Sequence, residues 1–194
     1  MTNQAATLRV AVFPRSGLVT DGLLALGGAA FVGVAAQISH KLGFTPVPLT
    51  GQTFAVLLVG AAYGAILGAI SLSLYLLLGL VGVPWYASHA YGWSEFSGAS
   101  GGYIVGFVLA AAVTGWLSER GWDKRFSSSI ASMLTGSVVI YVCGAVWLHH
   151  YLHVNWNTTL VDGVYPFVPG DLVKLYLAAA ALPAAWKLVQ KIRS

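Results

Sequence analysis

The sequence contains very little charge. Asp, Glu, Lys and Arg make up 8% of its 194 residues, whereas hydrophobic residues make up 57% and the mean hydropathy is +0.76. About a quarter of the residues of a soluble domain are charged, so this composition excludes one and favours a single integral membrane bundle. The net charge is +4, but the basic residues flank apolar runs, where they orient membrane spans. We therefore expect a lipid bilayer, and no nucleic acid, as a partner.

The sequence also lacks the residue patterns of common enzymes. Its one cysteine, Cys143, cannot form a disulfide within the chain. No G-x-x-x-x-G-K-[ST] motif is present to hold the phosphates of ATP, and no Ser–His–Asp spacing indicates a nucleophile. We therefore expect no catalytic residue, no metal and no cofactor.

Long apolar runs dominate what is present. They fall at about 18–39, 54–82, 101–117, 128–148 and 172–190. The second run has no charged residue over 29 positions, which corresponds to about 44 Å of helix, against a hydrocarbon core of about 30 Å. It must therefore tilt strongly or break into two short spans near Tyr63 and Gly64.

The basic residues decide between these alternatives. They form three clusters, which precede the first run, separate the third from the fourth, and follow the last: Arg9 and Arg15; Arg120, Lys124 and Arg125; Lys187, Lys191 and Arg193. Because such clusters favour the cytoplasmic side, an even number of spans should separate each cluster from the next. Breaking the second run into two spans gives four spans between the first and second clusters and two between the second and third. We predict one all-α transmembrane domain, residues 1–194, with six helices and both termini cytoplasmic. The spans are expected at about 18–39, 52–63, 65–82, 101–117, 128–148 and 171–190.

The first span carries small residues at every fourth position, namely Ala25, Ala29 and Gly33. Small side chains at this spacing let helices approach closely. They serve either packing within the bundle or docking of another membrane protein. The arginines before the span make it similar to a signal peptide, but its apolar part is as long as a span, so we expect it to be retained.

The last span opens with an acid and a base. Asp171 and Lys174 lie three residues apart, on one helix face, ahead of a long uncharged stretch. A lysine near a helix N-terminus faces the positive end of the dipole, and ionisable groups inside a span indicate a functional site by default. The alternative is an interfacial helix cap with a lysine that extends to the membrane surface.

The segments 40–52, 84–100 and 149–170 should lie on the outer side. Their many aromatic residues form either an interfacial belt or the walls of a pocket. Gln52 follows a proline-stiffened loop and serves either a ligand or the loop backbone. Tyr103, one turn into its helix, is placed to point into a cavity.

Three histidines offer the only candidate metal ligands. His149, His150 and His153 could bind zinc, but no carboxylate or cysteine joins them in the motif. We therefore expect interfacial side chains there and no metal site.

Four runs together carry a family resemblance. They are PVPLTGQT at 46–53, GLVGVPWYA at 79–87, GGYIVGF at 101–107 and PFVPGDLVK at 166–174. Over about residues 18–190 the chain resembles the BioY family, the biotin-binding S components of energy-coupling factor (ECF) vitamin transporters.

The resemblance implies a substrate-binding subunit in the prokaryotic cytoplasmic membrane that takes up biotin with high affinity. Its partners would be a transmembrane coupling subunit and two cytosolic ATPases, which use the ATP. The implied biotin contacts are Asp171 and Lys174, with Gln52 nearby and aromatic walls from Trp85, Tyr86, Trp93 and Tyr103. The implied docking residues are Ala25, Ala29 and Gly33.

Two alternative functions stay open. One is an S component for another vitamin, and the other, from a different class, is a membrane-embedded enzyme that uses the histidine cluster. The sequence also leaves open whether the protein transports without its partners and whether it forms homo-oligomers when alone.

Overall fold

The structure is a computed structural model that describes residues 7–14 and 17–193, so Arg15 of the first basic cluster lies outside the described residues. The chain folds mainly into helices. These are α1 (Leu8–Val12), α2 (Leu18–Gln37), α3 (Gln52–Tyr63), α4 (Ala65–Leu80), α5 (Gly92–Phe96), α6 (Gly101–Glu119), α7 (Phe126–Leu152), α8 (Trp156–Gly163) and α9 (Val168–Arg193). A 3-10 turn, η1 (Ala87–His89), precedes α5, and two short antiparallel strands, β1 (Ser39–His40) and β2 (Leu49–Thr50), connect α2 to α3.

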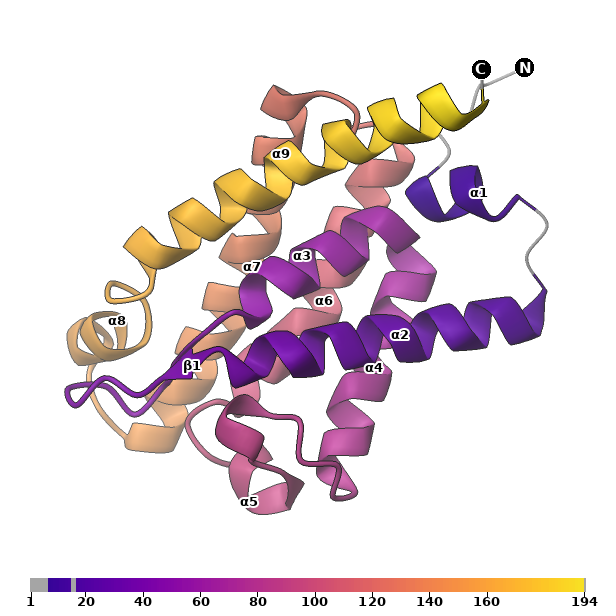
Figure 1. Cartoon of the computed structure of the whole chain (residues 1–194). Coiled ribbons are helices and arrows are strands. Elements are labelled where there is room, and N and C mark those ends of the chain that lie inside the picture. Colours follow the sequence, from indigo (N-terminus) through magenta and orange to yellow (C-terminus); the bar gives the residue numbers. More distant parts are fainter. Residues whose placement is uncertain (1–6, 15–16, 194) are drawn as a thin grey trace.

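Helix α6 lies at the centre of the bundle. It packs against α3, α4 and α7, while α2 rests on α3 and α4, and α9 rests on α3 and α7 (Figure 1). One end of the bundle holds α1, the C-terminal part of α9 and the loop 120–125; we call it the terminal end. The opposite end holds β1, β2, α5 and α8, and we call it the loop end.

The long uncharged run forms two helices. Gly64, between α3 and α4, has φ +90° and ψ 174°, a conformation that glycine adopts far more readily than other residues. The carboxylate of Glu119 accepts a hydrogen bond from the Ala65 N–H at 2.9 Å and so caps the start of α4. The helix break expected near Tyr63 and Gly64 is therefore present, while the crossing of a bilayer by each half stays a prediction.

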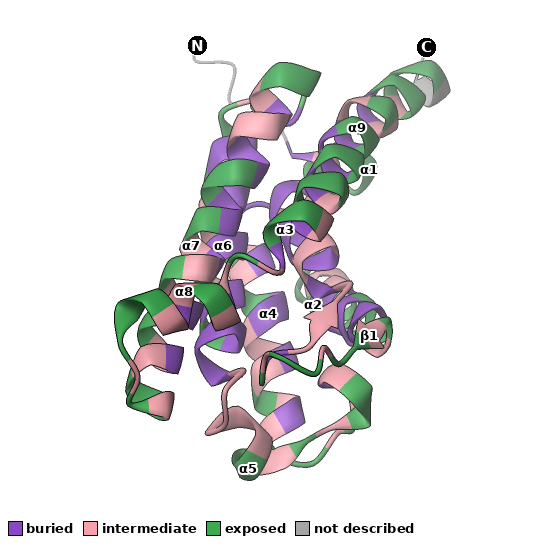
Figure 2. Cartoon of the chain, turned by 90° about the vertical axis from the view of Figure 1, so that its left-hand side faces the viewer, coloured by how far each residue is buried: buried purple, intermediate pink, exposed green. Residues whose placement is uncertain are grey.

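The outer surface of the bundle is apolar. Within the described residues, four helices are long and apolar enough to cross a membrane, namely α2, α6, α7 and α9, and α3 and α4 are shorter apolar helices. Exposed residues cover the outward faces of α7 and α9, whereas buried residues gather inside (Figure 2), and large aliphatic side chains such as Leu23, Val138 and Leu177 are exposed. An apolar surface of this extent indicates contact with lipid, so the chain is a multi-pass membrane protein.

The small residues of α2 do not form an exposed docking face. Ala25 is 2% exposed and Ala29 is fully buried, and a Cβ added to the buried Gly33 would lie 3.1 Å from the Trp85 Cβ. The expectation of a docking stripe is corrected here: the three residues serve packing within the bundle. An adjacent stripe of α2, which carries Gly22, Leu26 and Ala30, is exposed.

Candidate functional site

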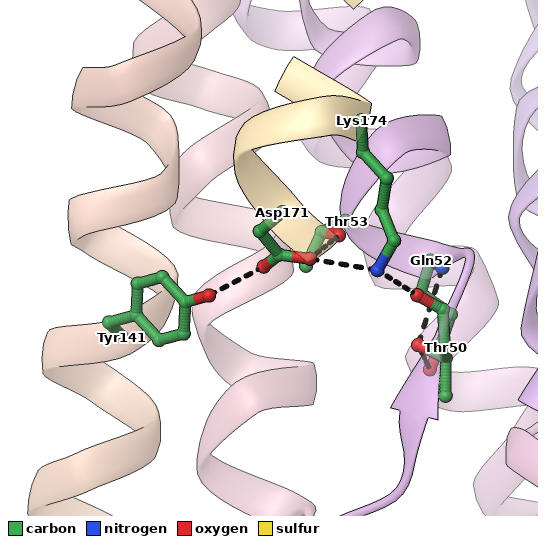
Figure 3. Close-up of polar contacts among 6 residues, drawn as sticks. All are labelled: Thr50, Gln52, Thr53, Tyr141, Asp171 and Lys174. Atoms are coloured by element: carbon green, nitrogen blue, oxygen red, sulfur yellow. Dashed lines mark hydrogen bonds and ion pairs between the residues drawn. The ribbon is translucent and has the colours of Figure 1, made fainter. Parts of the chain in front are cut away.

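A buried carboxylate organises the loop end. Asp171, near the start of α9, is 7% exposed. Its Oδ1 accepts hydrogen bonds from Thr53 Oγ1 at 3.0 Å and Lys174 Nζ at 2.8 Å, and its Oδ2 accepts one from the Tyr141 hydroxyl at 2.7 Å (Figure 3). Hydrogen bonds to charged groups contribute about 1.5–3 kcal/mol each. Three helices, α3, α7 and α9, are thus joined through one side chain.

Lys174 points into the bundle rather than toward the membrane surface. Besides Asp171, its ammonium donates a hydrogen bond to the Thr50 carbonyl oxygen of β2 (Figure 3). The lysine therefore ties α9 to the loop that precedes α3. This geometry differs from that of a lysine that extends to the membrane interface, because the Lys174 ammonium bonds Asp171 and the Thr50 carbonyl instead.

A second polar network lies beside the first. Gln52 is 5% exposed; its Oε1 accepts from Thr50 Oγ1 at 2.9 Å and its Nε2 donates to the Tyr75 hydroxyl at 2.7 Å. Tyr75 and Trp85 are joined in both directions, because the Tyr75 hydroxyl donates to the Trp85 carbonyl at 3.2 Å and the Trp85 ring N–H donates to the Tyr75 carbonyl at 2.8 Å. Gln52 therefore holds the loop to α4.

A cavity of about 50 Å³ lies between these networks. Five of the residues singled out in the sequence line it: Gln52, Tyr86, Tyr103, Asp171 and Lys174. Its apolar lining comes from Val47, Pro48, Leu49, Ala87, Ile104, Phe107, Ile140 and Phe167. The polar groups therefore lie along the wall of an otherwise apolar space, as is typical of small-molecule sites.

Two tyrosines of this cavity are fixed by backbone acceptors. The Tyr103 hydroxyl donates to the Gly163 carbonyl of α8 at 2.6 Å, and the Tyr86 hydroxyl donates to the Leu76 carbonyl of α4 at 2.6 Å. Burial, together with the negative charge of Glu95, raises the pKa of Tyr86 to about 12. Tyr86 is therefore a neutral donor at physiological pH, and both tyrosines line the cavity.

Two of the predicted aromatic residues lie outside the cavity lining. Trp85 packs behind it, with its ring 5.3 Å from that of Tyr75. Trp93 is 68% exposed and packs on Phe96 at 5.7 Å. The expectation that these two rings line the same pocket as Tyr86 and Tyr103 is not met in this cavity.

The histidine cluster packs against aromatic and hydroxyl side chains. His149 stacks on Trp156, with the ring centres 4.2 Å apart and nearly parallel, and lies 3.4 Å from Thr159 Oγ1. In the described part of the chain, no group of three His, Cys, Asp or Glu side chains is placed to hold a metal ion. The histidine cluster therefore gives no support to the enzyme alternative.

Sequence reasoning missed two donors to Asp171. Thr53 stood in the quoted loop motif but received no role. Tyr141 lies in the middle of an apolar helix, where a hydroxyl that needs a buried partner was the available signal.

The sequence profile of the BioY family matches residues 3–191. The "Biotin transporter BioY" of Rhizobium etli is 35% identical over 164 residues, which cover 81% of this chain and 87% of that protein. The "Probable biotin transporter BioY" of Pyrococcus horikoshii is 38% identical over 159 residues, which cover 82% and 90%. The "Biotin transporter BioY" of Thermotoga maritima is 38% identical over 150 residues, which cover 77% and 86%.

A solved structure shares the fold. The crystal structure of "the S-component for biotin from an ECF-type ABC transporter" superposes with a TM-score of 0.78 and 26% identity, and covers 87% of this chain and 92% of that one. The family profile spans nearly the whole chain, and the three biotin transporters named above are each more than 30% identical to it over most of its length. The chain therefore belongs to the BioY family.

Proposed function

We propose that this chain binds biotin and serves as the substrate-binding subunit of an ECF-type transporter. The observation that carries the proposal is the cavity in which the Asp171–Lys174 pair meets an apolar and aromatic wall. Family membership and the biotin transporters among its relatives support the same ligand.

The chemistry of biotin matches this lining. Biotin joins a ureido ring, which offers N–H donors and a carbonyl acceptor, to an apolar sulfur ring with a carboxylated tail. The Lys174 ammonium can donate to the ureido carbonyl or to the carboxylate, while Phe107, Phe167 and Tyr86 can cover the apolar sulfur ring. A charge-assisted hydrogen bond contributes about 1.5–3 kcal/mol, so one or two of them in a dry cavity support tight binding.

The cavity must widen to receive biotin. Its volume of about 50 Å³ holds only a few water molecules, whereas ligand pockets ordinarily measure about 300–1,000 Å³. The loop between β1 and β2 covers the cavity through Val47 and Pro48. We propose that this loop moves outward when biotin binds.

We propose six spans in the prokaryotic cytoplasmic membrane, with the terminal end facing the cytoplasm. The positions of the basic residues support this orientation, since Arg9, Lys187 and the cluster in the loop 120–125 gather at the terminal end, whereas Lys41 and Lys174 lie toward the loop end. Basic residues favour the cytoplasmic side. A cysteine at Ser94 should react with an external reagent in intact cells, and one at Lys124 should not; labelling at Lys124 would contradict the six-span topology.

We propose that a transmembrane coupling subunit and two cytosolic ATPases complete the transporter, so this subunit itself catalyses no reaction. The exposed face of α2 is the docking surface we now favour, because the buried face is used within the bundle. Ala30→Trp on the exposed face should abolish energised uptake while biotin binding persists. Ala29→Trp on the buried face should impair folding and binding together; normal uptake by Ala30→Trp would exclude this surface.

Titration of the purified protein tests the biotin assignment. Biotin should bind saturably at one site per chain, while riboflavin and thiamine should not bind. Saturable binding of another vitamin without biotin binding would instead favour the alternative S component. A folded protein that binds neither would contradict the proposed function.

A further inference from the structure

The hydrogen-bonding capacity of Asp171 is largely used within the protein. Its two oxygens already accept bonds from Thr53, Tyr141 and Lys174. A carboxylate has about four lone-pair sites, so little remains for ligand N–H groups unless an internal bond is broken. A ligand with several N–H donors needs a further acceptor in this cavity.

Glu95 is the other carboxylate that faces the cavity. It lies in α5, is partly buried, and lines both the inner cavity and an adjoining outer cavity that Lys41 and Ser88 also line. In the part of the chain that the structure describes, its carboxylate makes no hydrogen bond or ion pair. After burial, its negative charge contributes to the raised pKa of the neighbouring Tyr86 hydroxyl.

The carboxylate of Glu95 has acceptor capacity that the described side chains leave unused. Partly desolvated charges are stabilised by hydrogen-bond donors, and the hydroxyl of the neighbouring Tyr86 already donates to the Leu76 carbonyl. A ligand that enters the cavity is therefore positioned to donate hydrogen bonds to Glu95.

We propose that Glu95 accepts hydrogen bonds from the N–H groups of the bound ligand and is a specificity-determining residue of this site. The proposal rests on the proposed function, with the ureido N–H groups of biotin as the donors. Asp171 then mainly positions Lys174 through their hydrogen bond, while Glu95 accepts from the N–H groups of the ureido ring.

A negative acceptor should favour a positive donor group. The analogue 2-iminobiotin replaces the ureido group by a guanidinium, which pairs with carboxylates through charge-assisted hydrogen bonds. The affinity for this cationic analogue should therefore depend more strongly on the charge of Glu95 than the affinity for biotin does.

The test titrates purified variants with biotin and with 2-iminobiotin at pH 7. Glu95→Gln should weaken biotin about 10-fold or more and weaken 2-iminobiotin by about a further 10-fold. Glu95→Asp, which keeps the charge, should keep the ratio of the two affinities within about threefold of the parent. The matched control is Asp162→Asn, a carboxylate of the loop end outside both cavities, which should change neither affinity.

Two results would overturn the proposal. Affinities of Glu95→Gln for both ligands within about threefold of the parent would show that Glu95 touches neither. If Glu95→Gln lowered the affinities for both ligands by the same factor, the substitution would act by disturbing the fold and not by removing a contact with the ligand. A folded parent that binds no biotin would instead refute the proposed function, so the two failures are distinguishable.

Discussion

The two ends of the bundle each bury an aspartate, and they treat it differently. At the loop end, Asp171 accepts hydrogen bonds from three side chains on three helices. At the terminal end, Asp123 is fully buried; its Oδ2 accepts one bond, from the Trp186 ring N–H, and its Oδ1 has no partner among the described residues. Lys124 lies over the Trp186 ring at 4.9 Å and makes no ion pair with Asp123.

The difference shows where the fold concentrates its polar order. At the loop end, donors from α3, α7 and α9 converge on the carboxylate of Asp171, which borders a cavity. Lys174 also holds the loop that precedes α3. Asp123 fixes only a loop to the end of α9. The aspartate at the loop end thus joins three helices beside a cavity, whereas the aspartate at the terminal end accepts one hydrogen bond.

Removal of the base beside each aspartate should give the largest contrast. Lys174→Ala should weaken biotin binding by about 2–4 kcal/mol, or roughly 30- to 1000-fold, because it removes a ligand donor and leaves Asp171 without its counter-ion. Lys124→Ala is the matched change at the terminal end and should leave affinity unchanged. The check is titration of both purified variants; equal affinities would remove the distinction between the ends.

Added methyl groups should give an intermediate contrast. A Cβ at Gly144 would lie 2.2 Å from the Tyr103 ring, and one at Gly115 would lie 2.3 Å from the Gly64 backbone. Such overpacking costs about 1–3 kcal/mol, so both Gly144→Ala and Gly115→Ala should lower the melting temperature. Only Gly144→Ala should also weaken biotin binding, since it displaces a cavity wall.

Measured affinity and melting temperature of the two glycine variants separate these effects. If Gly115→Ala weakened binding as much as Gly144→Ala, the terminal end would be coupled to the cavity.

The smallest contrast concerns pH. Burial raises the pKa of Asp123, although the Trp186 hydrogen bond and Lys124 partly oppose this. A carboxyl whose folded pKa is raised is destabilising once ionised, so stability should fall as the pH rises from about 4 toward the folded pKa. Asp123→Asn removes this dependence.

Thermal melting between about pH 4 and 7 measures the effect. The melting temperature of the parent should fall relative to that of Asp123→Asn by a few °C, since about 1 kcal/mol corresponds to about 2–4 °C for a chain of this size. If the melting temperatures of the two proteins changed with pH in parallel, the result would contradict a buried Asp123 carboxyl with a raised pKa.

Much of the fold and part of the site could be predicted from the sequence. Charge-poor runs predicted membrane helices, and the length of one run predicted the break that Gly64 produces. Asp171 and Lys174 were identifiable because charge inside a span is costly, and they do line the cavity.

The rest could not be predicted, for a physical reason. Lipid and protein core are both apolar, so hydrophobicity along α2 does not tell which face lies inside, and Ala29 was assigned to the wrong surface. Aromatic residues likewise suit both an interface and a pocket, so the sequence did not separate Trp93 from Tyr103. Tyr141 acquires its partner, Asp171, only through a contact between residues distant in the sequence.

One substitution made at both aspartates tests the central claim most directly. Asp171→Asn and Asp123→Asn each remove one buried charge with little change in shape, and each variant is titrated with biotin beside the parent. We predict that Asp171→Asn lowers affinity about 30-fold or more while Asp123→Asn stays within about threefold of the parent. Affinities within threefold of the parent for both variants would contradict a biotin site built around Asp171.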